Sequence, residues 1–222
     1  MTPSNAIVVK LGGSLLGSPQ LPILLHTLVR TATDGQPVAI VPGGGPFADA
    51  VRDAQQRHGF DDDAAHDMAL LAMGQYGRLL AALADDQPRL CAGAGEVAAA
   101  LGRQPKRAAI WSPDPRRDAL DVERSWRVGA DALALWLAGR LGAGSVLLVK
   151  SCAPPIDERL TSLAASGVID AAYADMAAAA PTVATTLVYA SSAWSLDGKL
   201  AARSRSRTST TAARASEASR AP

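Results

Sequence analysis

Short apolar runs alternate along the chain with longer stretches in which apolar residues recur at helical spacing. Five runs rich in aliphatic residues lie at residues 6–9, 38–41, 108–111, 145–149 and 185–189. A short run that is apolar throughout is typical of a strand buried on both faces of a sheet. Between these runs, residues 64–83 and 130–141 place leucine and methionine side chains on or near one stripe, which predicts helices.

This alternation predicts the fold class. Strands separated by helices of ten or more residues require right-handed crossover connections and a mainly parallel sheet that is covered on both faces. We therefore expect an α/β fold, a three-layer sandwich with a mainly parallel central sheet. In such sheets ligands bind beyond the carboxyl ends of the strands. The turns that follow the predicted strands are therefore the places where chemistry is expected.

Length and composition favour one globular domain followed by a polar tail. The chain has 222 residues, of which 48% are apolar and 19% charged, and this suits a single domain over residues 1–200. Residues 201–222 are almost entirely Ala, Ser, Thr and Arg, with five arginines and one acid. Such a segment buries too little apolar surface to offset the entropy of ordering, so we expect a disordered basic extension. The alternative, contact with nucleic acid, lacks interleaved aromatic residues for base stacking.

The remaining global features predict a soluble cytoplasmic protein. The net charge of +1 gives no reason to expect a nucleic-acid or membrane partner. Cys91 and Cys152 form no CxxC pair and suit idle thiols in a reducing compartment. No signal-peptide pattern follows Met1, and the apolar stretches are too short or too interrupted to span a bilayer.

Two glycine-rich turns follow the first two predicted strands. In the first, Lys10 ends the strand and Gly12, Gly13 and Ser14 come next, with Ser14 as a candidate helix N-cap. Backbone N–H groups without a neighbouring Cβ approach an anion closely, and a helix terminus and a lysine add positive charge. This combination suits a polyphosphate, although a tight turn beside a surface lysine explains the same residues.

The second turn repeats this arrangement with three glycines. Gly43, Gly44 and Gly45 precede Pro46, whose fixed φ suits the first turn of a helix. Residues 43–48 also match a G-x-G-x-x-A dinucleotide pattern, but the acidic residue that this fingerprint needs at the end of the next strand is missing. No G-x-x-x-x-G-K-[ST] motif occurs, which excludes a P-loop protein.

These motifs carry a family resemblance. The segments KLGGS (10–14), PGGGPFAD (42–49) and GADALALWLAGRLGAGSVLLVK (129–150) resemble the amino-acid kinase family, which includes the acetylglutamate, aspartate and uridylate kinases. Further features resemble a small branch of the family that phosphorylates an aminomethylfuran phosphate during methanofuran-type cofactor synthesis. These features are the segment 65–81, the spacing of Trp126, Val128 and Asp131, and the segment LLVKS that ends at Ser151. The resemblance covers about residues 6–175.

The resemblance implies a site at the carboxyl edge of the sheet, with MgATP on one side and the acceptor on the other. It implies that Lys10 and Lys150 neutralise phosphoryl charge and that Asp131 orients both lysines, which makes these three the catalytic residues. The residues expected to bind the nucleotide are Gly12, Gly13, Ser14, Lys150 and Ser151. The residues expected to hold the acceptor are Gly43, Gly44, Gly45 and Phe47. No metal-ligand spacing occurs, so Mg²⁺ is expected to arrive with the ATP.

The chain also departs from the family pattern. Relatives usually continue from the strand that ends at Lys150 with an Asp-Gly turn, whereas this chain has Pro154 and Pro155. Asp170 stands where carboxylate kinases tend to place a lysine, in agreement with the branch. The usual last strand and its glycine turn are not recognisable in residues 185–207. The pocket for the nucleotide base and the closure of the domain therefore stay open.

Several other residues have two interpretations. Arg116, Arg117, Arg124 and Arg127 suit either a bidentate clamp on an acceptor phosphate or a solvated loop. Trp111, Trp126 and Trp136 are expected to pack rather than to stack on a ligand. His66 suits helix packing or contact with the substrate, and His26 and His58 are expected at the surface.

The sequence thus predicts an ATP-dependent kinase that transfers the γ-phosphoryl group to an anionic oxygen of a small molecule, by positioning and charge neutralisation. The favoured acceptor is the phosphate of an aminomethylfuran phosphate. The alternatives are a carboxylate kinase of the acetylglutamate type and a nucleotide- or oxyanion-binding relative without turnover. Because family members commonly associate, a homo-oligomer is expected, with no specific nucleic-acid partner and no membrane partner.

Overall fold

The computed structural model describes residues 5–190, and within them six strands form one sheet. The strands are β1 (Ile7–Leu11), β2 (Val38–Pro42), β3 (Arg89–Ala92), β4 (Ala109–Ser112), β5 (Ser145–Lys150) and β6 (Ala184–Tyr189). Their order across the sheet is β3-β4-β2-β1-β5-β6, and every neighbouring pair is parallel. The predicted α/β fold with a parallel central sheet is confirmed.

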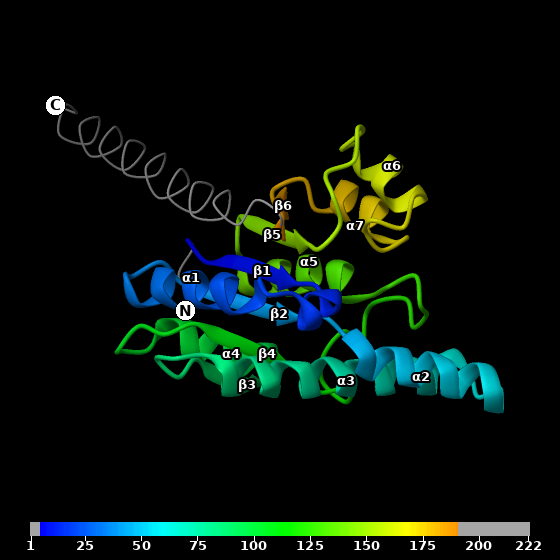
Figure 1. Cartoon of the computed structure of the whole chain (residues 1–222), viewed down its shortest axis with the longest axis horizontal. Coiled ribbons are helices and arrows are strands. Elements are labelled where there is room, and N and C mark those ends of the chain that lie inside the picture. The colour runs from blue at the N-terminus through cyan, green and yellow to red at the C-terminus, as the bar shows by residue number, and fades with distance from the viewer. Residues whose placement is uncertain (1–4, 191–222) are drawn as a thin grey trace, which may run out of the picture.

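Helices cover both faces of this sheet (Figure 1). They are α1 (Leu21–Thr33), α2 (Gly45–His58), α3 (Asp62–Leu83), α4 (Ala94–Gly102), α5 (Ala130–Leu141), α6 (Leu160–Ala165) and α7 (Tyr173–Ala179), together with a short 3-10 helix, η1 (Gly13–Gly17). One apolar core joins the sheet to α1, η1 and the second half of α3. The other joins it to α4, α5 and α7. The described residues therefore form the predicted three layers.

The central strand β1 shows how the sequence sets up the site. Its alternate residues Ile7, Val9 and Leu11 pack into one core, whereas Val8 packs into the other. Lys10 interrupts this apolar pattern near the carboxyl end of the strand and is only 8% exposed. A lysine held inside a buried parallel sheet needs a counter-charge, because an isolated buried cation is strongly unfavourable.

The predicted strands all occur, but one strand was missed. β3 (Arg89–Ala92) lies at one edge of the sheet, and only Cys91 among its residues is buried. Its mixed sequence lacks the continuous apolar character of β1 or β5, so no strand pattern was visible. The single domain over residues 1–200 stays a prediction, and the predicted basic tail, residues 201–222, lies outside the described residues. Within residues 5–190, no helix combines the length and the apolar character that crossing a membrane requires.

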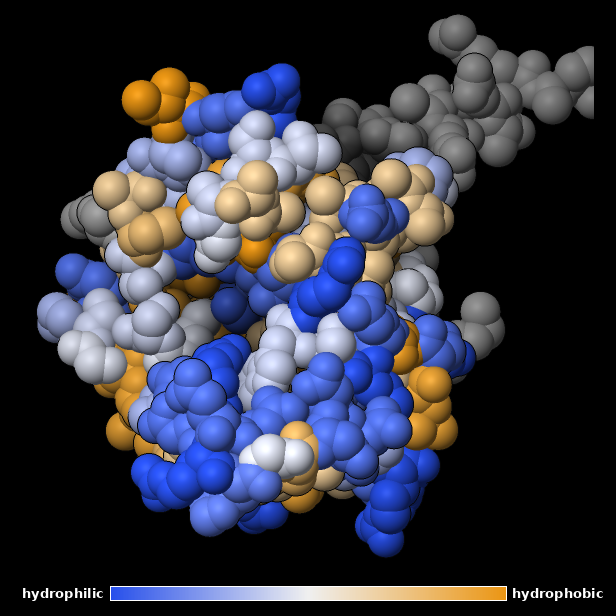
Figure 2. Space-filling view, turned by 90° about the vertical axis from the view of Figure 1, so that its right-hand side faces the viewer, coloured by the Kyte–Doolittle hydropathy of each residue, from blue (hydrophilic) through white to orange (hydrophobic). Residues whose placement is uncertain are grey.

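The carboxyl edge of the sheet is where the chain leaves room for a site. In Figure 1 the arrowheads of β1 and β5 point toward the side from which α2 extends below and α6 and α7 rise above. The space-filling view onto that side shows a hollow between these two parts of the molecule (Figure 2). Both glycine turns follow strands that end at this edge, as the sequence predicted.

Candidate active site

The two glycine turns lie in backbone contact at the carboxyl edge of the sheet. A Cβ atom on Gly13 would overlap backbone atoms of Gly45, and one on Gly43 would overlap the backbone nitrogen of Gly13. The N–H of Gly43 donates to the carbonyl of Leu11 at 2.8 Å, which ties the second turn to the end of β1. Only residues without side chains allow the two turns to approach in this way.

The second turn also presents the first turn of α2. Gly45 has φ +55°, a left-handed conformation that favours glycine, and α2 starts at this residue. A Cβ on Gly44 would overlap the side chain of Ala48, one turn further along the helix. The first N–H groups of α2 have no partner within the helix, so they are available to an anion.

Lys10, Asp131 and Lys150 form a buried charge cluster beside these turns. Asp131 lies in the first turn of α5, and its Oδ1 is 3.0 Å from Lys10 Nζ. Its Oδ2 accepts a hydrogen bond from Lys150 Nζ at 2.5 Å. Asp131 is 3% exposed and each lysine 8%. The structure therefore brings together the three residues for which the sequence predicted a catalytic role.

The electrostatics of this cluster depend on burial and on mutual charge. Burial alone would raise the pKa of Asp131, but the charges of Lys10 and Lys150 and their hydrogen bonds hold it below its ordinary value. Burial and then the charge of Lys10 lower the pKa of Lys150, and Asp131 opposes this shift only in part. One carboxylate between two ammonium groups leaves the cluster with net positive charge, which suits an anionic ligand.

The predicted role of Ser14 as a helix N-cap is wrong, but the residue does lie at the site. Gly12 occupies the N-cap position of η1, and no side chain caps this helix. The hydroxyl of Ser14 instead lies 2.7 Å from the hydroxyl of Ser151, just after β5. Gly12 lies between the strands, since a Cβ there would be 3.3 Å from the carbonyl oxygen of Val149 and 3.6 Å from Lys10 Nζ. The residues predicted to bind the nucleotide therefore lie along the ends of β1 and β5.

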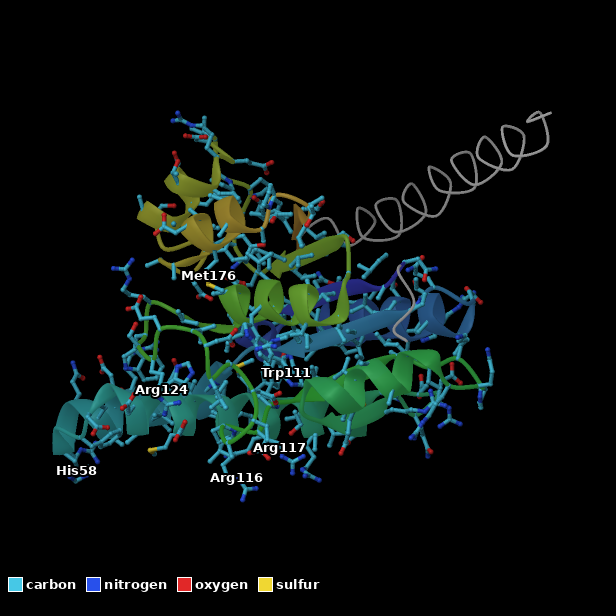
Figure 3. The ribbon with its side chains drawn as sticks, turned by 180° about the vertical axis from the view of Figure 1, so that it is seen from behind. His58, Trp111, Arg116, Arg117, Arg124 and Met176 are labelled. Atoms are coloured by element: carbon cyan, nitrogen blue, oxygen red, sulfur yellow. The ribbon has the colours of Figure 1, made fainter. Side chains whose placement is uncertain are left out.

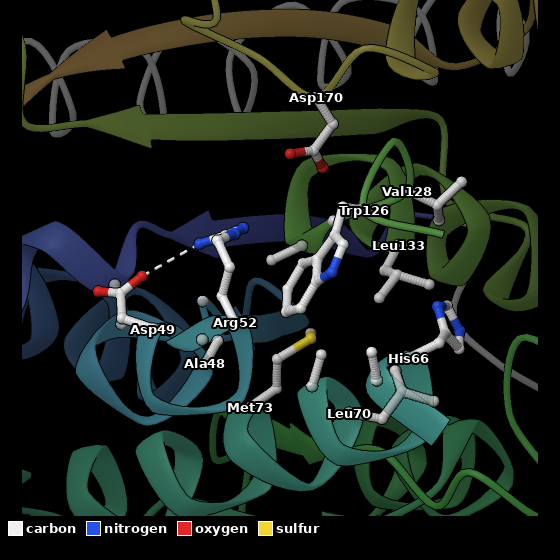
Figure 4. A pocket seen from close by; sticks show the side chains of 18 of the residues that line it. Ala48, Asp49, Arg52, His66, Leu70, Met73, Trp126, Val128, Leu133 and Asp170 are labelled. Carbon is white, nitrogen blue, oxygen red and sulfur yellow. Dashed lines mark hydrogen bonds and ion pairs between the residues drawn. The ribbon is translucent and has the colours of Figure 1, made fainter. Parts of the chain in front are cut away.

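A cavity of about 210 Å³ opens beside the glycine turns (Figure 4). Of the predicted site residues, those that line it are Lys10, Gly13, Gly43, Gly44 and Gly45. The others that line the cavity come from α2, from one face of α3, from the segment before α5 and the first turn of α5, and from the loop before α7. Its wall includes the apolar side chains of Leu70, Met73, Val128 and Leu133 and the charged side chains of Arg52 and Asp170.

Phe47 does not line this cavity, contrary to the sequence prediction. It packs instead against the apolar core that contains α1, because the first turn of α2 directs its side chain toward the sheet. Besides Gly45, the α2 residues that line the cavity are Ala48, Asp49 and Arg52. Sequence reasoning missed Arg52, although its position one turn after Ala48 puts both on one face of the helix.

Trp126 lines the cavity, although it was expected to serve only in packing. The guanidinium of Arg52 lies 4.2 Å from the centre of its ring. Its indole Nε1 donates to Oε1 of Gln55 at 2.6 Å. The Nε2 of Gln55 in turn donates to Oδ1 of Asp62 at 2.8 Å. This chain of hydrogen bonds fixes the aromatic wall against α2 and the start of α3. The indole therefore has both a packing role and a position at the cavity.

His66 projects from α3 toward the same cavity (Figure 4). The side chain is buried, and its Nε2 has no hydrogen-bond partner among the described residues. Burial, and next the charge of Arg124, lower the pKa of His66, while Asp67 and Asp63 oppose the shift. The imidazole is therefore neutral near pH 7, and both roles expected for it, helix packing and contact with the substrate, stay predictions.

Asp170 lies in the loop before α7 and points down into the cavity in Figure 4. Its Oδ2 accepts a hydrogen bond from the N–H of Ala132 at 2.9 Å, which satisfies an amide at the start of α5. A Cβ on Gly129 would lie 2.6 Å from Oδ1, so only glycine fits beside it. Burial, and next the charge of Asp131, raise the pKa of Asp170. Asp170 therefore supports the helix that carries Asp131.

The four arginines between β4 and α5 form no phosphate clamp at this cavity. Arg116 and Arg117 pair with Asp114 at the outer surface (Figure 3). Arg124 instead binds the carboxylates of Asp63 and Asp67 on α3. Arg127 lies 3.7 Å from Glu123, and none of the four lines the cavity. Of the two expectations for these arginines, the solvated loop therefore describes Arg116, Arg117 and Arg127.

Other predicted features lie away from the site. Trp111 and Trp136 stack with their ring centres 5.7 Å apart, in agreement with the packing role expected for them. His26 and His58 are exposed, as expected. Pro154 and Pro155 lie in a connection without helix or strand between β5 and α6. Among residues 5–190, no three His, Cys, Asp or Glu side chains gather so as to hold a metal ion.

The sequence matches the model of the amino acid kinase family over residues 5–154. A relative from Methanocaldococcus jannaschii, [5-(aminomethyl)furan-3-yl]methyl phosphate kinase, is 26% identical over 144 residues. That match covers 64% of this chain and 63% of the relative, so the chain spans somewhat less than two thirds of the relative's length.

Solved structures of low sequence identity share the fold. Uridylate kinase from Archaeoglobus fulgidus has a TM-score of 0.60 at 18% identity, with 85% of this chain and 91% of that chain covered. Carbamate kinase from Giardia lamblia, solved with AMP-PNP bound, has a TM-score of 0.55 at 13% identity, with 90% and 97% covered.

Proposed function

The chain belongs to the amino acid kinase family, and we propose that it transfers the γ-phosphoryl group of ATP to an anionic oxygen of a small molecule. The observation that carries the proposal is the cluster of Lys10, Asp131 and Lys150 beside two glycine turns in backbone contact. Buried cations and uncovered backbone amides at one point are what a migrating phosphoryl group requires.

In the proposed reaction an acceptor oxygen attacks the γ-phosphorus of ATP, a P–O bond forms, and the bond to the β,γ-bridging oxygen breaks to release ADP. Lys10 neutralises charge on the phosphoryl group during its transfer, and Asp131 holds Lys10 in place. The amides of Gly12 and Gly13 hold the phosphoryl oxygens from one side. Those of Gly44 and Gly45, at the start of α2, hold them from the other.

The proposed nucleotide site lies at the carboxyl ends of β1 and β5, on the side that faces away from the cavity. Lys150 supplies positive charge toward the phosphates of ATP, and Ser14 and Ser151 offer hydroxyl groups beside it. Mg²⁺ enters the proposal as a companion of ATP. Both carboxylate oxygens of Asp131 are paired with lysines, so the described residues suit an ion held by phosphate oxygens and water. When bound, that ion neutralises charge on the nucleotide phosphates.

We propose the phosphate of an aminomethylfuran phosphate as the acceptor, with a diphosphate as the product. The relative from Methanocaldococcus jannaschii supports this choice by its name. The cavity supports it by chemistry, since an apolar wall and Trp126 suit a small ring and the glycine turns suit its phosphate. No general base is required, since a phosphate oxygen is already anionic.

A coupled assay tests this proposal. The purified full chain is given ATP and Mg²⁺ with either aminomethylfuran phosphate or N-acetylglutamate, and ADP release is followed together with the ³¹P spectrum of the product. The proposal expects ADP and a diphosphate only with the furan phosphate. ADP with N-acetylglutamate alone would identify a carboxylate kinase instead. A rise in melting temperature with ATP, but no ADP with either acceptor, would identify a binding protein without turnover.

The proposal includes a homo-oligomer that acts in the cytoplasm, where ATP is supplied. Met68 and Leu71 on α3 are 39% and 54% exposed, and they lie one helical turn apart on the outside of the molecule. Apolar side chains in this arrangement suit an association surface. Light scattering of the purified chain measures its mass directly, and a monomer at every concentration would contradict this part of the proposal.

A further inference from the structure

The cavity is a channel whose wall follows one face of α3. Met73, Leu70, His66 and Asp62 are three or four positions apart, so their side chains share that face. The hydroxyl of Tyr76 donates to the carbonyl of Gly12 at 3.4 Å, which places the Met73 end of this face next to the glycine turns. At 1.5 Å per residue, His66 lies about 10 Å further along the helix axis than Met73. His66 and Asp62 therefore belong to the end of the channel away from the phosphoryl group.

The two ends of this channel differ in charge. Lys10 and the first amides of α2 make the inner end attractive to an anion. The outer end has the carboxylate of Asp62 in the cavity wall, at the residue where α3 begins. The rest of the wall includes the apolar side chains of Leu70, Met73, Val128 and Leu133, together with the charged side chains of Arg52 and Asp170. A molecule that fits this distribution carries negative charge at one end, an uncharged body, and positive charge at the other end.

At the outer end, His66 has a buried ring nitrogen without a hydrogen-bond partner among the described residues. Its side chain is 5% exposed and faces the cavity, and no described residue bonds to its Nε2. Buried polar atoms in proteins nearly always have a hydrogen-bond partner, so one that lacks a partner beside a cavity needs an explanation. A neutral imidazole has one nitrogen without a proton, which accepts a hydrogen bond from a donor such as an ammonium group.

Asp62 is already held in the position that such an ammonium group would require. Its Oδ1 accepts a hydrogen bond from Gln55, and the same amide accepts one from Trp126. No described residue donates to its Oδ2. This carboxylate oxygen is therefore free to stabilise a positive charge near His66, and the network through Gln55 keeps it from turning away.

We propose that His66 is a specificity-determining residue that binds a protonated primary amine at the end of the acceptor opposite its phosphate, and that Asp62 stabilises the charge of this amine. The inference rests on the proposed kinase function, since it takes the glycine turns as the phosphate end. It defines the acceptor class as a zwitterion with an anionic phosphate, a small uncharged ring and an ammonium group. The lowered pKa of His66 agrees with this role, because a neutral imidazole does not repel the ammonium group.

The test compares two acceptors that differ only in the distal group. The full chain is assayed with ATP and either aminomethylfuran phosphate or the analogue in which a methyl group, which cannot form a hydrogen bond, replaces the amino group. We expect wild type to prefer the amine by about 30-fold in kcat/KM, since a site built for a hydrogen-bonding group rejects analogues that lack it. The variant His66→Leu should reduce this preference to about threefold or less, mainly by raising KM for the amine.

Three further variants separate recognition from folding. His66→Gln keeps a hydrogen-bond acceptor and should retain part of the preference for the amine. Asp62→Asn should weaken the preference as well. Asp63→Asn is its matched control, because the Asp63 carboxylate pairs with Arg124 and does not line the cavity. If the asparagine substitutions at positions 62 and 63 change the preference equally, the assigned carboxylate is wrong.

The outcomes distinguish the inference from the proposed function. If wild type phosphorylates both acceptors equally well, or if His66→Leu keeps the wild-type preference, the inference is overturned while the kinase function stands. If wild type phosphorylates neither, the proposed function fails. In that case, calorimetry measures the affinity for aminomethylfuran phosphate without ATP, which tests the inference independently of turnover. Equal affinity for wild type and for His66→Gln and His66→Leu would overturn it, and a loss of affinity of about tenfold in His66→Leu would support it.

Discussion

Gly13 and Gly45 touch through their backbones, although 32 positions and a complete helix and strand separate them in the sequence. A Cβ on Gly13 would overlap backbone atoms of Gly45, so neither turn can be moved without moving the other. Because the turns follow neighbouring parallel strands, their contact fixes the spacing of the amides that face the cavity. This contact gives a physical reason for two glycine motifs in one site.

Gly13→Ala should damage the site more than any surface substitution. The overlap is with backbone, which no side-chain rotamer relieves, so we expect a loss of about 2 kcal/mol in the free energy of unfolding and at least a tenfold loss in kcat. The matched control is Gly17→Ala at the other end of η1, where a Cβ meets nothing within 4 Å. Thermal unfolding and the coupled assay measure both effects. Equal behaviour of the two variants would contradict the backbone contact.

Lys10→Met should abolish most of the turnover without unfolding the protein. Methionine keeps the length and apolar stem of the side chain, and Lys150 remains to balance Asp131. Since the lost charge acts most strongly on the transition state, we expect kcat to fall by about two orders of magnitude. Lys106→Met serves as control, because Lys106 does not line the cavity. Near wild-type turnover in the Lys10 variant would mean that the site is elsewhere.

The sequence predicted the parts of this fold that rest on local patterns. The runs at 6–9 and 145–149 are apolar except for Ser145 because β1 and β5 are buried on both faces, so their identity as strands was readable. Lys10 was readable as a candidate site residue from the glycine turn beside it, whereas Lys150 was readable only through the resemblance. That Asp131 lies between these lysines depends on how α5 packs on the sheet, which no spacing within one segment reveals.

Residues whose positions depend on helix rotation or on distant partners escaped prediction. Phe47 and Arg52 are both on α2, and the exact start of the helix at Gly45 decides which of them faces the cavity. The sequence alone therefore could not show that Phe47 packs against the apolar core and Arg52 faces the cavity. Trp126 lies in a segment without periodicity, and its partner Gln55 is 71 positions away. Only tertiary packing brings such a pair together.

The pH dependence of kcat/KM should show the burial of Lys150. Burial, and next the charge of Lys10, lower the pKa of Lys150 below its ordinary value of 10.5, so it loses its proton at a lower pH than an exposed lysine. We therefore expect activity to fall on the basic side before pH 10.5. In Lys150→Arg this fall should move to higher pH, because arginine stays charged. Lys106→Arg is the control, and a basic limb that does not move in Lys150→Arg would contradict the assignment.

The stability of the protein should fall below about pH 6.5 because of His66. The folded protein lowers the pKa of His66 through burial and the charge of Arg124, so the unfolded chain binds this proton first as the pH falls. The contribution is complete above the unfolded pKa and is lost as the pH drops through the folded one. In His66→Leu the slope of the free energy of unfolding between pH 6.5 and 5 should be smaller. The variant His26→Leu, which removes an exposed histidine, serves as control. Equal slopes in wild type and His66→Leu would contradict the burial of His66.

Arg52→Ala should weaken acceptor binding and leave the chemical step nearly intact. Arg52 stacks on Trp126 and lines the cavity, but it makes no contact with the cluster of Lys10 and Asp131. Removing its charge and its cover over the indole should raise KM for a phosphorylated acceptor by about tenfold, with kcat within about threefold of wild type. Arg57→Ala is the matched control, since Arg57 is an exposed arginine on the same helix outside the cavity. Steady-state kinetics with varied acceptor at saturating ATP separates the two constants. A fall in kcat with unchanged KM would instead place Arg52 at the phosphoryl group. The phosphate of the acceptor would then bind at the end of the cavity opposite to the one proposed.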